Sequence, residues 1–479
     1  MYKKTKIVAT ISDKRCDVDF IRDLYENGMN VVRLNTAHQT HEDALKVIKN
    51  VRKVSDKIAI LLDTKGPEIR TNEQDEDFPV NAGDIVYMKG APGVKSSKTC
   101  INLSYENFVD DVTVGAKILI DDGMLELKVL EDDGEKLKCQ VMNKGKIQGH
   151  KSVNIPSALI KLPALTRKDI RFINFAVEHK LDFIAHSFVR KAADVIAVQS
   201  ILDSHGSDMK IIAKIENEEG VQNIDEILEH AYGIMVARGD LMVEISSPRL
   251  PVVQRMLVRK AVEARKPVIV ATQMLQSMIE NPRPTRAEVN DIATAIAEGT
   301  DAIMLSGETA YGKYPVEAVQ TMTAIAHEIE ANLPDMITLP PKVISNPTAS
   351  YLMKSAVEAS VQLPIRVIIS DTTSGNTVRG MAAYRGKKLI YAHCYRENVM
   401  RMLALSFGVY ADYGKVPKVH AQFIKEALQN LLNRGGYKRD DQVLIISGSF
   451  GKANGSSFIE VGEVDQLMEL AEHAASMTE

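Results

Sequence analysis

Two short segments combine a cation with a carboxylate at a spacing suited to binding a metal ion and a phosphate. Lys214 stands two residues before Glu216, and Gly239 separates Arg238 from Asp240. Residues two apart on an extended strand point to the same side. Mg²⁺ takes one or two protein carboxylates and completes its shell with water and substrate oxygens. A lysine beside it could neutralise a migrating phosphoryl group or a developing enolate. Taken alone, the Lys-x-Glu segment more often forms a surface salt bridge, and the Arg-Gly-Asp segment more often forms a turn. The predicted strands and helices around them decide whether the two segments form one site.

Those elements are eight short apolar runs that alternate with amphipathic helical stretches, which is typical of parallel strands. The runs are Lys6–Ile11, Met29–Leu34, Ile58–Leu62, Leu181–His186, Lys210–Ala213, Gly233–Val236, Pro267–Ala271 and Ala302–Leu305. Most starts lie about one βα unit apart, but Ile58 and Leu181 are separated by 123 residues. The pattern predicts an α/β fold, a (β/α)8 TIM barrel with a domain inserted after the third strand. A doubly wound open sheet could also hold eight strands.

Polar side chains follow nearly every run, and this favours the barrel, whose strand ends meet on one rim. They are Arg33, Asn35, His38, Asp63, Thr64, Lys65, Ser187, Arg190, Lys214, Glu216, Arg238, Asp240, Thr272, Gln273, Ser306 and Glu308. Such a mixture of cations, carboxylates and hydroxyls suits an anionic phosphorylated substrate held with a divalent cation.

The domain boundaries follow from changes in pattern. Residues 1–67 and 163–335 would form the barrel, and residues 68–162 a small β-barrel lid between Pro67 and Pro163. Within the lid, Asp122-Gly123 predicts a hairpin between Ile118–Asp121 and Met124–Lys128. A linker would follow that contains Pro334, Pro340, Pro341 and Pro347. Residues 336–479 would form a third, α/β domain with strands at Val367–Ser370, Lys388–Ala392 and Gln442–Ser447.

Composition narrows the functional classes. Lys and Arg total 59 against 63 Asp and Glu, so a net charge of −4 offers no field for nucleic acid or an anionic membrane surface. Four scattered cysteines without a C-x-x-C pair argue against a disulfide framework and for a reducing compartment. No signal peptide or membrane span is recognisable. We therefore expect a cytoplasmic protein.

Taken together and in order, several segments resemble the signatures of the pyruvate kinase family. They are Asp63-Thr-Lys-Gly-Pro-Glu-Ile-Arg70, Ile212-Ala-Lys-Ile-Glu-Asn217, Met235-Val-Ala-Arg-Gly-Asp-Leu241, Ala271-Thr-Gln-Met-Leu275, Asn281-Pro-Arg-Pro-Thr-Arg286 and Met304-Leu-Ser-Gly-Glu-Thr309. The resemblance runs from Thr5 to the C-terminus and is strongest over the barrel. It implies transfer of phosphate from phosphoenolpyruvate to ADP, giving pyruvate and ATP.

The resemblance also implies a role for each matching residue. Lys214 would stabilise the transferring phosphoryl group, Arg33 would hold the phosphate, and Glu216 and Asp240 would hold Mg²⁺ or Mn²⁺. Gly239, Asp240 and Thr272 would bind the substrate carboxylate, while Thr272 and Ser306 would belong to a proton-relaying network. The nucleotide phosphates would meet His38, Arg70 and Lys151.

Family members usually also need a monovalent cation, held by an Asn, a Ser, an Asp and a Thr carbonyl. Asn35, Asp63 and Thr64 match, but Ala37 stands at the Ser position. Glu68 matches the K⁺-requiring branch, where the K⁺-independent branch carries Lys. The resemblance therefore implies K⁺ dependence with a weakened or water-completed site.

A further segment resembles the family's allosteric phosphate loop. It consists of Thr372, Thr373, Ser374, Gly375, Asn376 and Thr377, between a predicted strand and a helix, and a loop from Ser447 to Ser457 could close over it. Hydroxyls and backbone N–H groups there suit a phosphorylated effector, although an ordinary helix cap fits equally well. By analogy with the family we expect a homotetramer.

Two other functions share part of this pattern. A different barrel enzyme that stabilises an enolate with Mg²⁺ would use the same carboxylates, but it has no need of the lid or of Arg70. A non-catalytic effector-binding relative would not need the complete set Lys214, Glu216, Asp240 and Thr272. An assay of ADP-dependent pyruvate formation distinguishes all three.

Overall fold

The computed structural model describes residues 2–156, 158–333, 346–417, 419–448 and 456–476. Eight parallel strands close into a barrel in the order β1-β17-β16-β15-β14-β13-β3-β2. Their bounds are β1 Lys6–Thr10, β2 Val31–Asn35, β3 Ala59–Asp63, β13 Phe183–His186, β14 Lys210–Ile215, β15 Gly233–Ala237, β16 Val268–Ala271 and β17 Ala302–Leu305. The predicted TIM barrel and all eight of its strands are confirmed.

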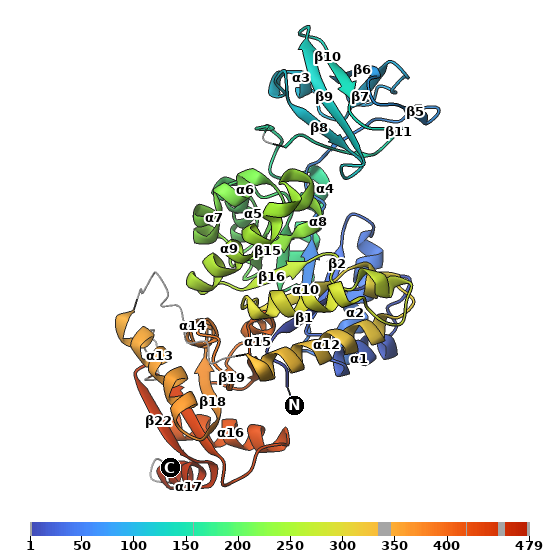
Figure 1. The fold of residues 1–479 in the computed structure, drawn as a ribbon. Helices are drawn as coiled ribbons and strands as arrows, with labels where there is room; N and C mark the ends of the chain where they lie inside the picture. Colours follow the sequence, from blue (N-terminus) through green and yellow to red (C-terminus); the bar gives the residue numbers. More distant parts are fainter. Residues whose placement is uncertain (1, 157, 334–345, 418, 449–455, 477–479) are drawn as a thin grey trace.

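Helices surround the barrel (Figure 1). The longer ones are α1 Val18–Glu26, α2 His41–Val54, α4 Arg167–Glu178, α5 Ala192–Ser204, α9 Leu250–Glu263, α10 Arg286–Ala297 and α12 Pro315–Asn332. Shorter helices at the loops are α6 Glu218–Gln222, α7 Ile224–His230, α8 Arg238–Glu244, α11 Gly307–Ala310, and the 3-10 turns η1 Ser247–Arg249 and η2 Gln276–Ile279. Three of the helices begin with reciprocal capping boxes, at Thr40, Thr166 and Thr285, which satisfy backbone N–H groups that a helix start leaves unpaired.

The lid stands at one end of the barrel (Figure 1). It contains β4 Ile69–Arg70, β5 Phe78–Val80, β6 Ile85–Gly90, β7 Cys100–Leu103, α3 Phe108–Asp111, β8 Lys117–Ile120, β9 Leu125–Asp132, β10 Leu137–Val141, β11 Gly145–Ile147 and β12 Ser152–Asn154. Seven strands pair in the order β4-β12-β8-β9-β10-β6-β7, and a bridge from Thr71 to Leu103 joins the two edge strands. The sheet therefore curls into the predicted barrel-like lid.

The predicted hairpin in the lid joins β8 to β9, which pair antiparallel. Its turn is longer than a two-residue loop, since β8 ends at Ile120 and β9 begins at Leu125. Asp121 and Asp122 both have positive φ, 57° and 51°, before Gly123 at 84°. Aspartate tolerates this left-handed region better than most residues do, so the turn suits its sequence.

The C-terminal domain lies at the other end of the barrel (Figure 1). Its five-stranded sheet has the order β20-β19-β18-β21-β22, with β18 Ile365–Thr372, β19 Leu389–Cys394, β20 Val409–Tyr413, β21 Gln442–Ser447 and β22 Phe458–Glu463. Its helices are α13 Pro347–Gln362, α14 Asn376–Ala382, α15 Glu397–Met402, α16 His420–Asn433 and α17 Val464–Ser476, with the 3-10 turn η3 Leu403–Leu405. The two edge strands β20 and β22 were not predicted.

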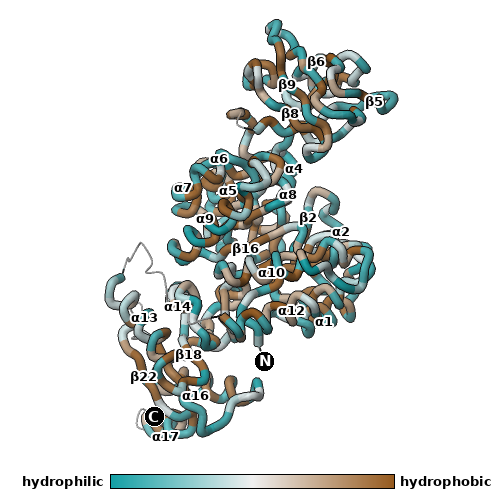
Figure 2. The backbone as a smooth tube through the Cα atoms, viewed as in Figure 1, coloured by the Kyte–Doolittle hydropathy of each residue, from teal (hydrophilic) through white to brown (hydrophobic). Residues whose placement is uncertain are grey.

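Figure 2 shows the hydrophobic residues concentrated along the strands, between more hydrophilic outer helices. Most of the predicted linker, residues 334–345, lies outside the described residues, and Pro347 begins α13. Residues 449–455 of the predicted C-terminal loop lie outside them as well. Among the described residues, none of the helices has the length and apolar character that crossing a bilayer requires.

Candidate active site

The polar residues of the site continue the inward-facing rows of the barrel strands. Side chains alternate along a strand, and Val31, Leu61 and Ile212 lie in the apolar cluster that fills the barrel. Arg33, Asp63 and Lys214 each follow two residues later, nearer the carboxyl end of β2, β3 and β14. The same alternation that buries the core therefore carries these three side chains into one place above it.

Lys214 is at the centre of this group and uses all the donors of its ammonium. Its Nζ lies 2.7 Å from Ser187 Oγ, 2.9 Å from Glu216 Oε1 and 3.1 Å from Asp63 Oδ1. Burial would lower the pKa of Lys214, but the charges of Asp63 and Glu216 outweigh it and raise the pKa above its ordinary value. The lysine is therefore a fixed positive charge.

Arg33 joins the group through Asp63. Its Nε lies 2.6 Å from Asp63 Oδ2, and its Nη1 donates to Thr10 Oγ1 at 3.0 Å. Burial would raise the pKa of Asp63, yet Arg33 and Lys214 together hold the pKa of that carboxyl below its usual range. The Asp63 carboxylate thus fixes both cations at once.

Glu216 and Asp240 fit a divalent cation. Burial raises the pKa of Glu216 to about 7, and the charge of Asp240 adds to this effect. Burial also raises the pKa of Asp240, with Lys214 acting in the opposite direction. Two buried acids that each resist ionisation would be stabilised as carboxylates by Mg²⁺, which needs one or two of them. Among the described residues no group of three or more His, Cys, Asp or Glu side chains is arranged to hold a metal.

Thr272 lies in a strained turn directly after β16. Its φ of 71° is unusual for a β-branched residue. The Thr272 hydroxyl accepts a hydrogen bond from the Gly239 N–H at 2.8 Å and donates to the Ala271 carbonyl at 2.6 Å. Arg238, at the start of α8, donates to the Thr272 carbonyl through Nη2 at 2.6 Å. These contacts hold Thr272 against the turn that carries Asp240.

Ser306 follows β17 on the neighbouring side of the barrel. Its backbone N–H donates to Glu308 Oε2 at 2.7 Å, and the Leu275 N–H donates to Glu308 Oε1 at 3.0 Å. Glu308 therefore ties together the loops after the last two strands, which carry Thr272 and Ser306. The sequence pattern placed Glu308 on the rim but did not indicate this role.

The three residues predicted to hold K⁺ lie on two neighbouring strands. Asn35 in β2 is the register partner of Asp63 in β3, and Thr64 follows Asp63 directly. Asn35 Oδ1 accepts from the Ala37 N–H at 3.1 Å, and the Thr64 carbonyl accepts from Ser187 Oγ at 2.7 Å. Asp63 is engaged with the two cations described above, so these oxygens have protein partners in this conformation.

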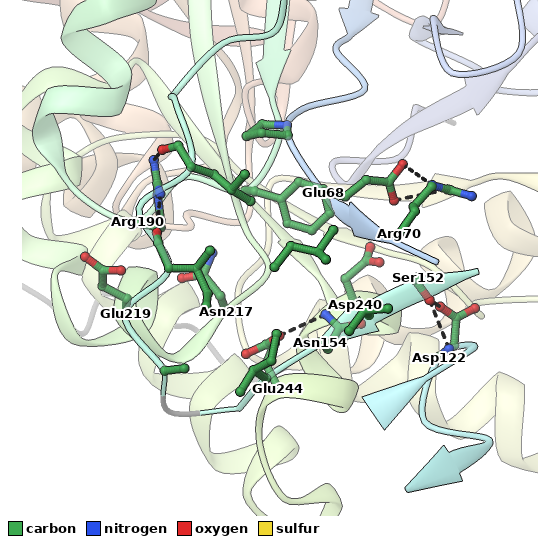
Figure 3. A pocket seen from close by; sticks show the side chains of 18 of the residues that line it. Glu68, Arg70, Asp122, Ser152, Asn154, Arg190, Asn217, Glu219, Asp240 and Glu244 are labelled. Atoms are coloured by element: carbon green, nitrogen blue, oxygen red, sulfur yellow. Dashed lines mark hydrogen bonds and ion pairs between the residues drawn. The ribbon is translucent and has the colours of Figure 1, made fainter. Parts of the chain in front are cut away.

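A cavity of about 590 Å³ separates the lid from the barrel rim. Figure 3 shows Asp240 and Arg70 on its walls, and Lys151 lines it as well. Arg70 forms a bidentate ion pair with Glu68, with Nε 2.7 Å from Oε1 and Nη2 3.1 Å from Oε2. Lys151 Nζ lies 3.0 Å from Asp121 Oδ1. The structure thus brings Arg70 and Lys151 to the same cavity as Asp240. His38 does not line it, and its N–H donates to the Asn35 carbonyl at 3.3 Å.

Two residues on the rim have a larger part in the site than their sequence indicated. Ser187 is 1% exposed, and its hydroxyl contacts Lys214, Asp63 and the Thr64 carbonyl. It continues the inward row of Phe183 and Ala185, a signal that was readable from the sequence. Arg190 contacts the chain returning from the lid, more than 25 residues away, which no local pattern indicates.

The loop predicted for an effector lies between β18 and α14 in the C-terminal domain. Gly375 has a φ of 80°, and its N–H donates to Thr372 Oγ1 at 2.8 Å. Thr377 Oγ1 lies 3.1 Å from Ser456 Oγ, which connects the loop to the segment before β22. Of the remaining loop residues, Thr373 and Ser374 stand between Thr372 and Gly375 in the chain, and Asn376 is the first residue of α14.

Comparisons with known proteins cover nearly the whole chain. A family model described as "Pyruvate kinase, barrel domain" matches residues 2–319, and one described as "Pyruvate kinase, alpha/beta domain" matches residues 351–461. A pyruvate kinase from Borreliella burgdorferi is 46% identical over 473 residues, which cover 97% of this chain and 98% of the relative. Pyruvate kinases from Bacillus licheniformis and Geobacillus stearothermophilus are each 42% identical, covering 97% and 98% of this chain and 81% of each relative.

Proposed function

The chain belongs to the pyruvate kinase family, and on this premise we propose that the group around Lys214 transfers the phosphoryl group of phosphoenolpyruvate to ADP, giving pyruvate and ATP. The observation that carries the proposal is the contact of one buried lysine with both Asp63 and Glu216, beside Arg33 and Asp240. This is a place for a phosphate dianion together with a divalent cation, which is what the reaction requires.

The proposed reaction breaks the bond between phosphorus and the enol oxygen while a β-phosphate oxygen of ADP attacks phosphorus. Arg33 and Lys214 hold the phosphoryl oxygens, so that charge is balanced as it moves from one oxygen to the other. Mg²⁺ or Mn²⁺, held by Glu216 and Asp240, would supply further neutralisation of the phosphoryl and carboxylate oxygens. Because the protein does little covalent work in such a transfer, the rigid contacts of Lys214 are the main requirement.

The enolate left behind takes a proton at its methylene carbon to become pyruvate. We assign Thr272 and Ser306 to the network that delivers it, since both lie on the loops that Glu308 joins. The Gly239 N–H, the Asp240 turn and Thr272 would hold the substrate carboxylate. Arg70 and Lys151 would bind the nucleotide phosphates after leaving Glu68 and Asp121, with His38 at the barrel side.

K⁺ would bind at Asn35, Asp63 and the Thr64 carbonyl, with water replacing the side chain that Ala37 lacks. Support comes from the register pairing of Asn35 with Asp63 and from Glu68, whose pairs with Arg70 and Lys65 place it at the same rim. The Thr64 carbonyl has two lone pairs, so it would bind K⁺ with one while it accepts from Ser187 Oγ with the other.

Further parts of the proposal concern regulation and assembly. The Thr372–Thr377 loop would bind a phosphorylated effector, supported by its hydroxyls and the left-handed Gly375.

The chain would form three domains, namely residues 1–67 with 163–335, residues 68–162, and residues 336–479. The three main sheets lie within these ranges, and the boundary at 335 lies outside the described residues. A homotetramer is proposed by family analogy. A cytoplasmic location is supported by the four free thiols.

A coupled assay of pyruvate formation tests the function directly. The protein should form pyruvate from phosphoenolpyruvate only when ADP and Mg²⁺ are both present, and chelation should abolish turnover. K⁺ should raise the rate. Pyruvate formation without ADP, or none with all components, contradicts the proposal.

A further inference from the structure

The lid joins the barrel through two chain segments, and barrel side chains hold both. The first segment follows β3. Asp169 Oδ1 accepts from the N–H groups of Lys65 and Gly66 at 3.1 and 3.3 Å. Gly66 has a φ of 71°, and a Cβ there would lie only 2.8 Å from Ser187 Cβ, so the backbone packs directly on the active-site loop. Asp169 is fully buried, which makes this attachment rigid.

The second segment returns from β12 to α4, and Arg190 holds it. Its Nη1 donates to the Ile160 carbonyl and its Nη2 to the Leu162 carbonyl, both at 2.9 Å. Its other edge pairs with Asp194, at 3.1 Å from both Nε and Nη2. Figure 3 shows Arg190 at the wall of the cavity. A guanidinium is planar. Hydrogen bonds from it to two carbonyls and one carboxylate therefore fix the orientation of Arg190 and the positions of the groups that it binds.

Arg190 is also attached to the reactive group by a very short path. Ser187 accepts from Lys214, the Phe188 N–H donates to Glu216 Oε2 at 2.6 Å, and the Val189 N–H donates to the Lys214 carbonyl at 3.3 Å. Arg190 is the next residue. Four successive residues therefore connect the proposed phosphoryl and metal ligands to the carbonyls of the lid segment.

We propose that Arg190, supported by Asp194, is a positioning residue that sets where the lid sits relative to Lys214 and Glu216. This inference rests on the proposed function. The groups that meet the nucleotide on the lid side, Arg70 and Lys151, depend on the lid position. The groups that meet phosphoenolpyruvate belong to the barrel. Loss of Arg190 should therefore weaken the use of ADP while leaving phosphoenolpyruvate binding almost unchanged.

The test compares Arg190→Met with the full-length parent protein. We expect kcat/KM for ADP to fall about 10- to 100-fold, as misplacement of a reactant on the order of an ångström does, with the KM for phosphoenolpyruvate within about twofold. Amide hydrogen exchange in residues 158–166 should accelerate, while exchange in β13 and β14 should not change. Arg190→Lys should recover only part of the ADP effect, because one ammonium cannot hold two carbonyls and a carboxylate in one plane.

Two further variants make the result decisive. Asp194→Asn keeps the guanidinium and its carbonyl contacts but removes the charge that orients it, so a smaller change in the same direction is expected, and it replaces Arg190→Met should that variant not fold. Arg22→Met is the matched control, because Arg22 pairs with Asp19 on α1 in an exposed ion pair remote from the lid, and it should behave as the parent does.

An unchanged ADP dependence, equal losses for both substrates, or unchanged exchange in residues 158–166 would overturn the role of Arg190. A parent protein that forms no pyruvate would instead overturn the proposed function, and the exchange measurement would still report on the contacts of Arg190 with the Ile160 and Leu162 carbonyls.

Discussion

Nζ of Lys214 lies 2.9 Å from Oε1 of Glu216, and the two side chains leave one strand two residues apart. With Asp63, Asp240 and Arg33 nearby, the group contains two cations and three carboxylates. With all three carboxylates ionised the group is negative, and a divalent cation, which favours that ionised form, would make it positive. This change of sign agrees with a site in which the divalent cation binds first and makes the binding of an anionic substrate favourable.

Replacing Lys214 with Met should remove most of the turnover. The variant keeps the length of the side chain but loses the charge that stabilises the transferring phosphoryl group, and single groups of this kind account for about 10²- to 10³-fold in kcat. Phosphoenolpyruvate should still bind measurably through Arg33 and the metal. Steady-state kinetics with a direct binding measurement checks both parts. Turnover equal to that of the parent would refute the role of Lys214.

Replacing Ala37 with Ser should strengthen the response to K⁺. The added hydroxyl would supply the side-chain oxygen that the proposed site lacks, next to Asn35, so half-maximal activation should need less K⁺. The measurement is a K⁺ titration of the parent and the variant in buffer free of Na⁺ and K⁺. Full activity of the parent in that buffer would show that it needs no monovalent cation.

Replacing Thr272 with Val should lower activity more than replacing it with Ser. Valine keeps the β-branched shape in the left-handed turn but removes the hydroxyl that accepts from the Gly239 N–H. An unpaired donor at a half-buried site costs about 1–3 kcal/mol, which corresponds to roughly 10- to 100-fold in kcat/KM if it falls on the transition state. Serine keeps the hydroxyl and should stay near the parent. Equal kinetics for both variants would remove Thr272 from the proposed network.

The buried Lys3 should make stability depend on pH. Burial lowers the pKa of Lys3 to about 7, against the opposing charge of Glu330, and its Nζ donates to Asn30 Oδ1 at 2.7 Å. Between this pKa and the ordinary value near 10.5, the unfolded chain binds more protons than the folded one, so the free energy of unfolding rises with pH by up to about 1.4 kcal/mol per unit. This gain in the free energy of unfolding is complete above pH 10.5, the ordinary pKa of lysine, and it is lost as the pH falls to about 7.

Denaturant unfolding between pH 7 and 9.5 measures this effect. Lys3→Met should show a flatter dependence on pH than the parent, and it should be relatively more stable near pH 7, where the parent bears the cost of a buried charge. The exposed Lys49→Met is the control and should follow the parent. Parallel curves for the parent and Lys3→Met would rule out Lys3 as the titrating group.

The features of this protein that depend on local pattern could be predicted from its amino-acid sequence. The eight apolar runs, the interval between Ile58 and Leu181, and the two-residue spacing of Lys214 and Glu216 predicted the barrel, the inserted lid and a shared face for the lysine and the acid. Period-two alternation also carried enough information to place Ser187 in the same inward row. Edge strands β20 and β22 were missed, since their half-buried residues give a weaker pattern than the central strands do.

Which side chains contact one another became clear from the three-dimensional arrangement of the strands and the lid. Asp63 contacts both Arg33 and Lys214 because closing the barrel brings β2, β3 and β14 around one interior. Arg190 meets Ile160 and Leu162 because the chain returns from the lid, which has a hydrophobic core of its own, beside the loop after β13. Neither relation has a signal in the local sequence, since contacts between distant segments depend on how the sheets close, whereas strand periodicity depends on the neighbouring residues alone.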